Sequence, residues 1–339
     1  MGYKNSAKGI VATAMGLYTK SSGNASTTFG YKTEASNWVS MAIGQETVAS
    51  GGNSFAGGQK SKSTSYQSFA FGFNTLSSGG ESVAMGNGTM ATSSQSFAMG
   101  SLFQANGWAS TALGSQTIAN GNISFAGGQG CKAIGVESFS FGFENVASGN
   151  ESVAFGRETM TTNYHTFATG NSSQANGWAS AAFGYLTLAN GGLSFATGDN
   201  TKAIGELSTA MGYSTKAKPF ASFVIGQYND TTGAQTIWWS GTDPAFVIGN
   251  GSGESARSNA FTVLQNGNTA IGHASPTQML DVNGNARFRL IASGTYSAPL
   301  NITSDGTLTT FTSDISMKKN IIPIDQALNK VLEMKGVYF

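Results

Sequence analysis

The sequence predicts an all-β fold, a parallel β-roll in which short coils stack into a solenoid. The first observation is a pentapeptide of the form Ser-x-Ala-x-Gly, which recurs every fourteen residues in sixteen consecutive copies. The second is that side-chain size alternates with a period of two inside each copy, which is the period of a strand. The third is composition, because 46 glycines and only 5 prolines in 339 residues fit a chain with many tight turns. A short period sustained over so many copies indicates a solenoid.

The coil has fourteen places, numbered 0 to 13 from the first residue of the pentapeptide. Place 0 is occupied by Ala12, Ser26, Ser40, Ser54, Ser68, Ser82, Ser96, Ser110, Ser124, Ser138, Ser152, Thr166, Ser180, Ser194, Ser208 and Ser222. Place 4 is glycine in all sixteen copies, and the second half of the coil repeats the pattern with Thr at place 7, a small residue at place 9 and often Gly at place 11. This predicts two half-coils of seven residues, each with a five-residue strand and a two-residue turn.

Residue size predicts which face points inward. The residues at places 0, 2, 4, 7, 9 and 11 are small, so we expect them to fill the interior of a flattened roll, where only small side chains fit. Cys131 lies at place 7 and is expected there as a small apolar residue. Places 8 and 10 carry mostly polar side chains and are expected to face water.

Places 1 and 3 form an apolar stripe along the whole roll. Their residues are too large for the interior, and a contiguous apolar patch of this size is rare on a soluble monomer. At a strand spacing of about 4.8 Å, sixteen coils make a ridge of roughly 75 Å. We therefore expect an obligate homo-oligomer, with a homotrimer as the favoured state. The predicted trimer core includes Phe69, Phe71, Phe97, Met99, Phe139, Phe141, Phe155 and Phe183.

Aromatic residues recur in the turns, at place 12 and at place 5. Two interpretations are open for the rings at place 12. They bind surface glycans by stacking, or they seal the ends of the roll and the contacts between subunits, which is the favoured interpretation because amphipathic rings commonly seal interfaces. The candidate binding residues are Trp38, Tyr66, Trp108, Tyr164 and Trp178.

The chain outside the repeats divides into short segments. Residues 1–11 are expected to lead into the first coil, and residues 227–245 to form a collar in which Trp238 and Trp239 cover the open end of the roll. A β region over 246–290 is expected to contain a hairpin at Asn266-Gly267, and a stretch over 291–312 a turn at Asp305-Gly306. A helix is predicted over 325–335, capped by Asp325, with Leu328, Val331 and Leu332 on its apolar face and Gly336 as its stop. The expected domains are therefore 1–229, 230–312 and 313–339.

Repeats such as Ser-Phe-Ala-Met-Gly and Ser-Val-Ala-Phe-Gly resemble those of the YadA-type trimeric adhesin head, over about residues 9–229. The resemblance implies a left-handed roll and three rolls about a shared axis. Residues 276–287 resemble the short β modules of phage tail fibres. The segment from Ser313 to Ile321 resembles the entry to an endosialidase-type intramolecular chaperone, which implies self-cleavage between Ser313 and Asp314 with Lys318 in the motif. Ser316 stands where that family has Arg, and the chain holds only the start of such a domain.

Composition argues against several function classes. The net charge is +1 and only 10% of residues are charged, so there is no basic footprint for binding nucleic acid or an anionic membrane, and we expect neither nucleic acid as a partner nor insertion into a membrane. No stretch of 18 apolar residues is present, and the N-terminal residues lack a secretory signal. His165 and His273 lack metal-ligand spacing, and Gly249–Gly253 lacks the lysine of a phosphate loop, so we expect no metal and no cofactor. The carboxylates form no evident catalytic pair.

These observations favour a structural attachment protein that is not an enzyme, a trimeric tail fibre of a phage or phage-like particle that binds a host-surface glycan or protein. Its expected partners are its own copies, the receptor and other fibre components, and its expected location is extracellular. The alternative is a cell-anchored bacterial trimeric adhesin. A polysaccharide-degrading spike is less favoured. Ice binding by rows of Thr is weaker still, because the repeated Thr is expected to point into the roll.

Overall fold

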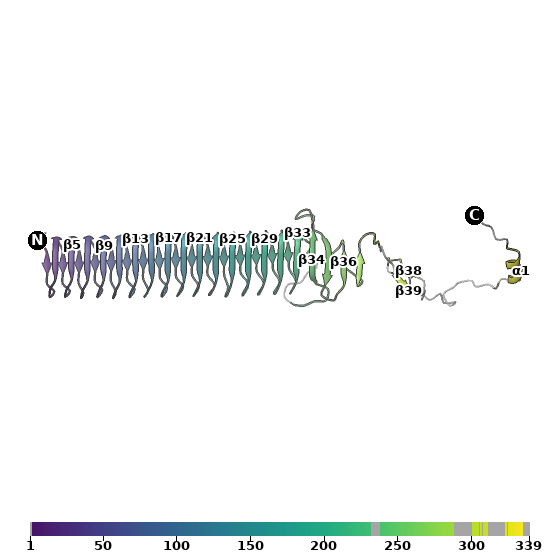
Figure 1. Cartoon of the computed structure of the whole chain (residues 1–339), viewed down its shortest axis with the longest axis horizontal. Helices are drawn as coiled ribbons and strands as arrows, with labels where there is room; N and C mark the ends of the chain where they lie inside the picture. The colour runs from purple at the N-terminus through teal and green to yellow at the C-terminus, as the bar shows by residue number, and fades with distance from the viewer. Residues whose placement is uncertain are drawn as a thin grey trace. The chain divides into compact units, whose positions relative to one another are not determined.

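The computed structural model describes residues 2–231, 238–287, 300–304, 306, 308–310, 323 and 325–334. The chain forms two compact units, Met1–Asn285 and Ala286–Phe339. The first unit contains a β-roll followed by a small mixed β region (Figure 1). The second contains one short hairpin and one short helix among its described residues.

The long strands of the roll stack side by side into one parallel sheet, the first sheet, which Figure 1 shows as a row of arrows. Phe69 pairs with Val83 and Gly72 with Gly86, a step of fourteen residues that confirms the predicted coil. The strands of the roll in this sheet are β1 (Gly2–Tyr3), β3 (Thr13–Leu17), β5 (Thr27–Tyr31), β7 (Met41–Gln45), β9 (Phe55–Gln59), β11 (Phe69–Phe73), β13 (Val83–Asn87), β15 (Phe97–Ser101), β17 (Thr111–Ser115), β19 (Phe125–Gln129), β21 (Phe139–Phe143), β23 (Val153–Arg157), β25 (Phe167–Asn171), β27 (Ala181–Tyr185), β29 (Phe195–Asp199), β31 (Thr209–Tyr213) and β33 (Phe223–Gln227).

The second sheet of the roll is also parallel and is built from two-residue strands. The expectation of a five-residue second strand is wrong, because place 11 forms a bend and places 12 and 13 a turn instead of continuing the strand. The strands are β2 (Ser6–Ala7), β4 (Lys20–Ser21), β6 (Glu34–Ala35), β8 (Val48–Ala49), β10 (Lys62–Ser63), β12 (Leu76–Ser77), β14 (Met90–Ala91), β16 (Gln104–Ala105), β18 (Ile118–Ala119), β20 (Lys132–Ala133), β22 (Val146–Ala147), β24 (Met160–Thr161), β26 (Gln174–Ala175), β28 (Leu188–Ala189), β30 (Lys202–Ala203) and β32 (Lys216–Ala217).

The roll starts earlier than the sequence predicts. Residues 1–11 were expected only to lead in, yet Gly2 pairs with Gly16 and Ser6 with Lys20. A strand can join the ladder through its backbone alone, so the absence of the pentapeptide at this end does not prevent pairing.

Small residues fill the interior, as predicted. Columns of Ala at places 2 and 9 are fully buried, and so is Cys131. The serine at place 0 closes the turn, because the Ser54 hydroxyl donates to the Gly51 carbonyl at 2.7 Å. The expectation that only small side chains fit is wrong at Phe103, which is fully buried at place 7. Its ring occupies the space beside Gly100, where a Cβ would lie 2.5 Å from the ring.

Glycine at place 4 is required by the close approach of neighbouring coils. Gly72 has a φ of 135°, and a Cβ on it would lie 2.0 Å from the Gly86 carbonyl oxygen. A side chain cannot be accommodated without moving backbone, so this glycine recurs in every copy.

A left-handed backbone conformation recurs every seven residues, at places 6 and 13, and most of these residues are not glycine. Even the β-branched Val11 and Ile123 adopt it, with φ of 57° and 56°, although such residues rarely do. The ladder holds Ile123 there, since its N–H donates to the Trp108 carbonyl of the preceding coil at 2.7 Å. This strain is therefore offset by hydrogen bonds between coils.

The roll ends at a junction where the register is interrupted and then resumes. β34 (Pro244–Asn250) pairs in parallel with β33, and Phe223, Val224 and Gly226 face Phe246, Val247 and Gly249. Val247 is buried and extends the interior column. The expectation that Trp238 and Trp239 cover the end of the roll is wrong, because their exposed fractions are 79% and 63%. β34 stacks on the last coil in their place, because its backbone continues the ladder.

The rest of the first unit is a short mixed sheet that continues from β34. β35 (Asn259–Leu264) pairs antiparallel with β34 and with β36 (Thr269–Ile271), and β37 (Leu280–Val282) pairs parallel with β36. The Asn266-Gly267 hairpin is confirmed, with a Gly267 φ of 92°.

The second unit holds an antiparallel pair, β38 (Leu300–Ile302) and β39 (Leu308–Thr310), and α1 (Ala327–Leu332). Gly306 has a φ of 88° in the predicted turn, whereas Asp305 lies outside the described residues. The predicted helix is confirmed but shorter, and its cap is wrong: Gln326 is the N-cap, in a left-handed conformation and without a side-chain cap bond. The stop at Gly336 lies outside the described residues.

Candidate binding surfaces

One face of the first sheet is apolar along the roll. The predicted trimer-core residues all lie on it, in two rows. At place 3 the exposed fractions are 48% for Phe71, 44% for Met99, 41% for Phe141 and 47% for Phe155, while Phe183 is half-buried. The residues at place 1, namely Phe69, Phe97 and Phe139, are half-buried.

Several rings on this face stack on those of the neighbouring coil. The ring centroids of Phe125 and Phe139 are 5.0 Å apart, and those of Phe141 and Phe155 are 5.8 Å apart. Gly127 leaves room for them, since a Cβ there would lie 2.6 Å from the Phe141 ring. At this position a small residue therefore precedes a large one, because the Phe141 ring occupies the space over Gly127 of the preceding coil. The face is a packed ladder of rings and not a set of isolated exposed residues.

The candidate binding rings at place 12 all lie at one edge of the roll and are about half exposed, at 56% for Trp38, 53% for Tyr66, 47% for Trp108, 52% for Tyr164 and 50% for Trp178. Asparagine side chains fix several of these turns. The Trp108 N–H donates to the Asn122 side chain at 3.0 Å, and the Tyr164 N–H donates to the Asn163 side chain at 2.9 Å. The turns therefore present the rings on an ordered backbone, one to four coils apart.

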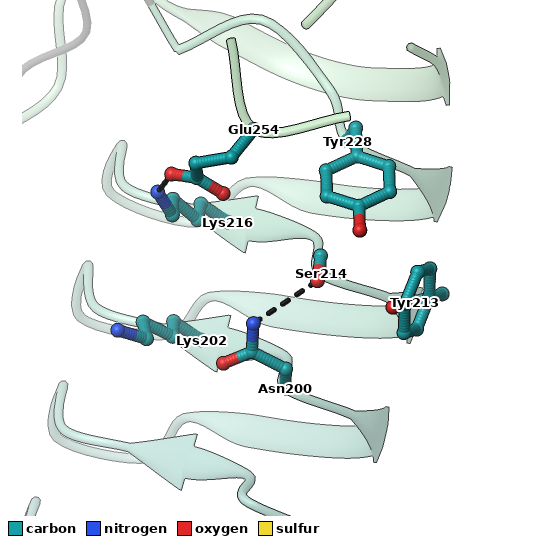
Figure 2. Close-up of a pocket in the computed structure, with 7 residues that line it drawn as sticks. All are labelled: Asn200, Lys202, Tyr213, Ser214, Lys216, Tyr228 and Glu254. Atoms are coloured by element: carbon teal, nitrogen blue, oxygen red, sulfur yellow. Dashed lines mark hydrogen bonds and ion pairs between the residues drawn. The ribbon is translucent and has the colours of Figure 1, made fainter. Parts of the chain in front are cut away.

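A cavity of about 330 Å³ lies at the opposite edge, where the roll meets the junction (Figure 2). It is lined by Asn200, Lys202, Tyr213, Ser214, Lys216, Tyr228 and Glu254. Asn200 and Ser214 come from the left-handed turns of successive coils, and Lys202 and Lys216 from β30 and β32. Glu254 comes from the loop between β34 and β35 and reaches back over the last coils.

Ion pairs hold that loop on the roll. Glu254 binds the Lys216 ammonium at 2.5 Å and the Arg257 guanidinium at 2.6 Å. Arg257 is largely buried and also donates to the carbonyls of Ser214 and Asn229, at 3.0 Å each. The hydrogen bond from Arg257 lowers the pKa of Glu254 most, and the hydrogen bond from Lys216 lowers it further, to about 2. The carboxylate is therefore charged at neutral pH.

The remaining polar groups of the cavity differ in their bonding partners. The Asn200 amide donates to the Ser214 hydroxyl at 3.0 Å. The rings of Tyr213 and Tyr228 meet edge to face at 5.2 Å, and their hydrogen bond raises the pKa of Tyr213. Lys202 forms no ion pair with any other described residue. Sequence reasoning missed this site, although lysine at place 8 of consecutive coils beside two tyrosines is a signal in the sequence.

A second cavity, of about 250 Å³, lies along the same edge near the N-terminal end of the roll. It is lined by Tyr18, Lys20, Lys32, Thr33 and Glu34. These residues occupy places 6, 7 and 8, as Asn200, Lys202, Ser214, Lys216 and Tyr228 do in the larger cavity. Tyrosine beside lysine is therefore a feature of this edge at both ends of the roll.

The two histidines considered from sequence lie apart, and each pairs with one carboxylate. His165 pairs with Glu151 at 3.2 Å and His273 with Asp281 at 3.3 Å, far apart on the fold. Within residues 2–231 and 238–287, as in the described part of the second unit, no group of three His, Cys, Asp or Glu side chains is placed to hold a metal. Gly249 lies in strand β34 and not in a phosphate loop. The candidate cleavage residues Ser313, Asp314 and Lys318 lie outside the described residues.

No helix among the described residues has the length and apolar character needed to span a membrane. No curated protein matches the chain. Three segments of the roll, residues 40–61, 77–102 and 133–159, match the family model described as YadA head domain repeat (2 copies). These three segments of the roll are therefore similar to YadA head repeats.

Proposed function

We propose that this chain is part of an extracellular homotrimeric fibre that attaches a phage tail, or a phage-like particle, to a host surface. The observation that carries the proposal is the ladder of rings on the first sheet. Phe71, Phe141 and Phe155 lie on one continuous apolar face, which is far larger than a few isolated exposed side chains.

A second copy of the same face is the occupant that fits this surface best. The face repeats with the fourteen-residue step of the coil, so an identical face in parallel register meets like with like along its whole length. The match to YadA-type head repeats supports three copies about one axis. In such a fibre the edges that carry Trp38, Trp108 and Trp178 are proposed to contact the receptor, a surface glycan or protein.

The C-terminal segment supports a tail fibre over a cell-anchored adhesin. The motif from Ser313 to Ile321 resembles the entry to an intramolecular chaperone that trimerises fibres and then cleaves itself off. We propose the same cleavage, between Ser313 and Asp314, in a chain that carries the complete chaperone. Ser316 in place of the family's Arg makes this step the one to test, by comparing the mass of the mature fibre with and without the substitution Ser313→Ala.

A cell-anchored bacterial adhesin remains the second candidate, and the YadA-type repeats favour it. An adsorption experiment distinguishes the two candidate functions. If the chain is a tail fibre, particles that lack it should lose binding to host cells, and added purified trimer should compete with intact particles. Unchanged adsorption without the fibre would contradict the tail-fibre proposal. New reducing ends after incubation of trimer with host polysaccharide would instead identify a degrading spike.

A further inference from the structure

We propose that the cavity between Lys202 and Tyr228 binds one acidic sugar residue of a surface polysaccharide, with the Lys202 ammonium holding the sugar carboxylate. The inference rests on the proposed attachment function and specifies the chemistry of one receptor contact. It concerns a different edge of the roll from the rings at place 12.

The charge of the cavity favours an anion. Three cations, Lys202, Lys216 and Arg257, stand against two carboxylates, Glu254 and Asp199. Lys216 and Arg257 are already paired with Glu254, which leaves Lys202 as the half-buried cation without an ion-pair partner among the residues described. A charge-assisted hydrogen bond to a ligand carboxylate would satisfy it.

The uncharged groups favour a sugar over a simple ion. The Asn200 amide and the Ser214 hydroxyl lie at the centre of the cavity, between the lysines and the tyrosine rings, as Figure 2 shows. Side-chain amides and hydroxyls match the hydroxyl groups of a sugar, because each can both donate and accept. Tyr213 and Tyr228 add amphipathic ring surface. A volume of about 330 Å³ accommodates a single small unit, near the lower end of the range for ligand pockets.

The position of the cavity allows the rest of a polysaccharide to continue outside it. The cavity opens at the edge of the roll, and the same edge carries the smaller cavity of Tyr18, Lys20 and Lys32 near the other end. Because the larger cavity is open at this edge, the neighbouring sugar units of a polysaccharide can extend from it into solvent.

The test compares a hyaluronan hexasaccharide, which carries a carboxylate on every second sugar, with the same hexasaccharide after its carboxyl groups are reduced to alcohols. Each hexasaccharide is immobilised, and its affinity is measured for the full-length wild-type protein and for two variants, Lys202→Gln and Asn200→Asp. We expect the reduced sugar to bind at least tenfold more weakly than the acidic sugar. Lys202→Gln should lose about tenfold in affinity, and Asn200→Asp should lose more, because it adds a negative charge without changing the shape of the side chain.

Matched controls separate the cavity from general attraction of an anion. Lys62→Gln and Lys132→Gln change the same residue type at the same place 8, where the lysine is exposed, and should leave affinity unchanged. Thermal unfolding of every variant establishes that it is folded. If one of the two cavity variants does not fold, the other still tests the cavity.

Three results would overturn the inference. They are equal binding of the acidic and reduced sugars, an equal loss in the Lys62→Gln control, and equal binding of a hexaglutamate peptide. If particles still adsorb to cells through the fibre while any of these is found, the cavity assignment fails and the attachment function stands. If adsorption does not depend on the fibre at all, the attachment function itself fails.

Discussion

The regular roll and the junction that ends it are stabilised in different ways. Within the roll, each coil repeats the same contacts: fourteen-residue backbone pairing, buried Ala columns and a serine that closes each turn. At the junction, a few individual side chains make contacts found nowhere else in the described roll, with Arg257 binding two carbonyls and Glu254. The roll depends on backbone fit and the junction on side-chain chemistry.

The difference shows where a repeat protein can place a specific site. A residue at a repeated place has nearly the same neighbours in every coil, so a unique constellation requires a break in the repeat. The interruption between β33 and β34 supplies such a break, because it brings Glu254 over Lys216 from outside the coil pattern. The larger cavity lies at this break.

Removing backbone fit should have the largest effect. Gly72→Ala places a Cβ 2.0 Å from the Gly86 carbonyl oxygen at a φ of 135°. We expect a loss of about 3 kcal/mol or more in the free energy of unfolding, measured by urea denaturation followed by circular dichroism. Gly80→Ala in the same coil is the control, because the nearest atom would lie 3.6 Å away and its φ is ordinary. A similar loss in both variants would show that close approach of the coils is not the cause.

Removing the junction's main donor should have a smaller, local effect. Arg257→Ala deletes the hydrogen bonds to Ser214, Asn229 and Glu254. We expect the last coils to open more easily by about 2 kcal/mol, measured by hydrogen exchange of the Ser258 amide, which donates to Tyr228 at 3.0 Å. Arg157→Ala is the control, because this arginine is 61% exposed, forms its ion pair with the adjacent Glu158 and lies over the Phe143 ring within the regular roll, away from the junction. Uniform loss of protection along the whole roll would contradict a local role.

Acid should weaken the junction before it weakens the roll. The pKa of Glu254 is about 2 in the folded protein and 4.5 in the absence of its partners, so its contribution is fully present above pH 4.5 and is lost as pH falls towards 2. Amide exchange at the junction, measured over this pH window and corrected for intrinsic rates, should report the loss. Glu254→Gln should remove that pH dependence. Persistence of the same dependence in the variant would assign it to another carboxyl.

The smallest effect concerns the closed interior of the roll. Cys131 is fully buried, and burial raises the pKa of its thiol. A thiol reagent should therefore modify the native protein very slowly and the urea-unfolded protein at once. Rapid modification of the native form, without loss of secondary structure, would mean that the roll opens locally at this coil.

The sequence predicts the roll down to individual residues because its period is imposed by geometry. Gly72 and Ala70 are required by the spacing of coils, so their identity reveals their position. The short second strand is not predicted, because place 11 forms a bend although the alternation of small residues continues through it. The left-handed residue at place 13 is not predicted either, because it carries no consistent side chain: Val11, Ile123 and His165 all occupy it. Hydrogen bonds between coils override residue preference there.

The junction is less predictable for the opposite reason. Phe223-Val-Ile-Gly226 recurs as Phe246-Val-Ile-Gly249, a signal that β34 resumes the register, and the structure confirms that pairing. The contacts of Arg257 and Glu254 depend on how the intervening chain turns back over the roll. Spacing in sequence holds no information on that path, so the cavity could be recognised only in three dimensions.

The central claim is that the ring ladder on the first sheet is covered by identical chains. Sedimentation equilibrium of the purified protein at low micromolar concentration tests it most directly. We predict that the wild-type protein sediments as a species of three times the chain mass of 34.9 kDa. The variant Phe141→Asp should sediment as a single chain or aggregate. A stable, soluble species of 34.9 kDa across the whole concentration range would contradict the account.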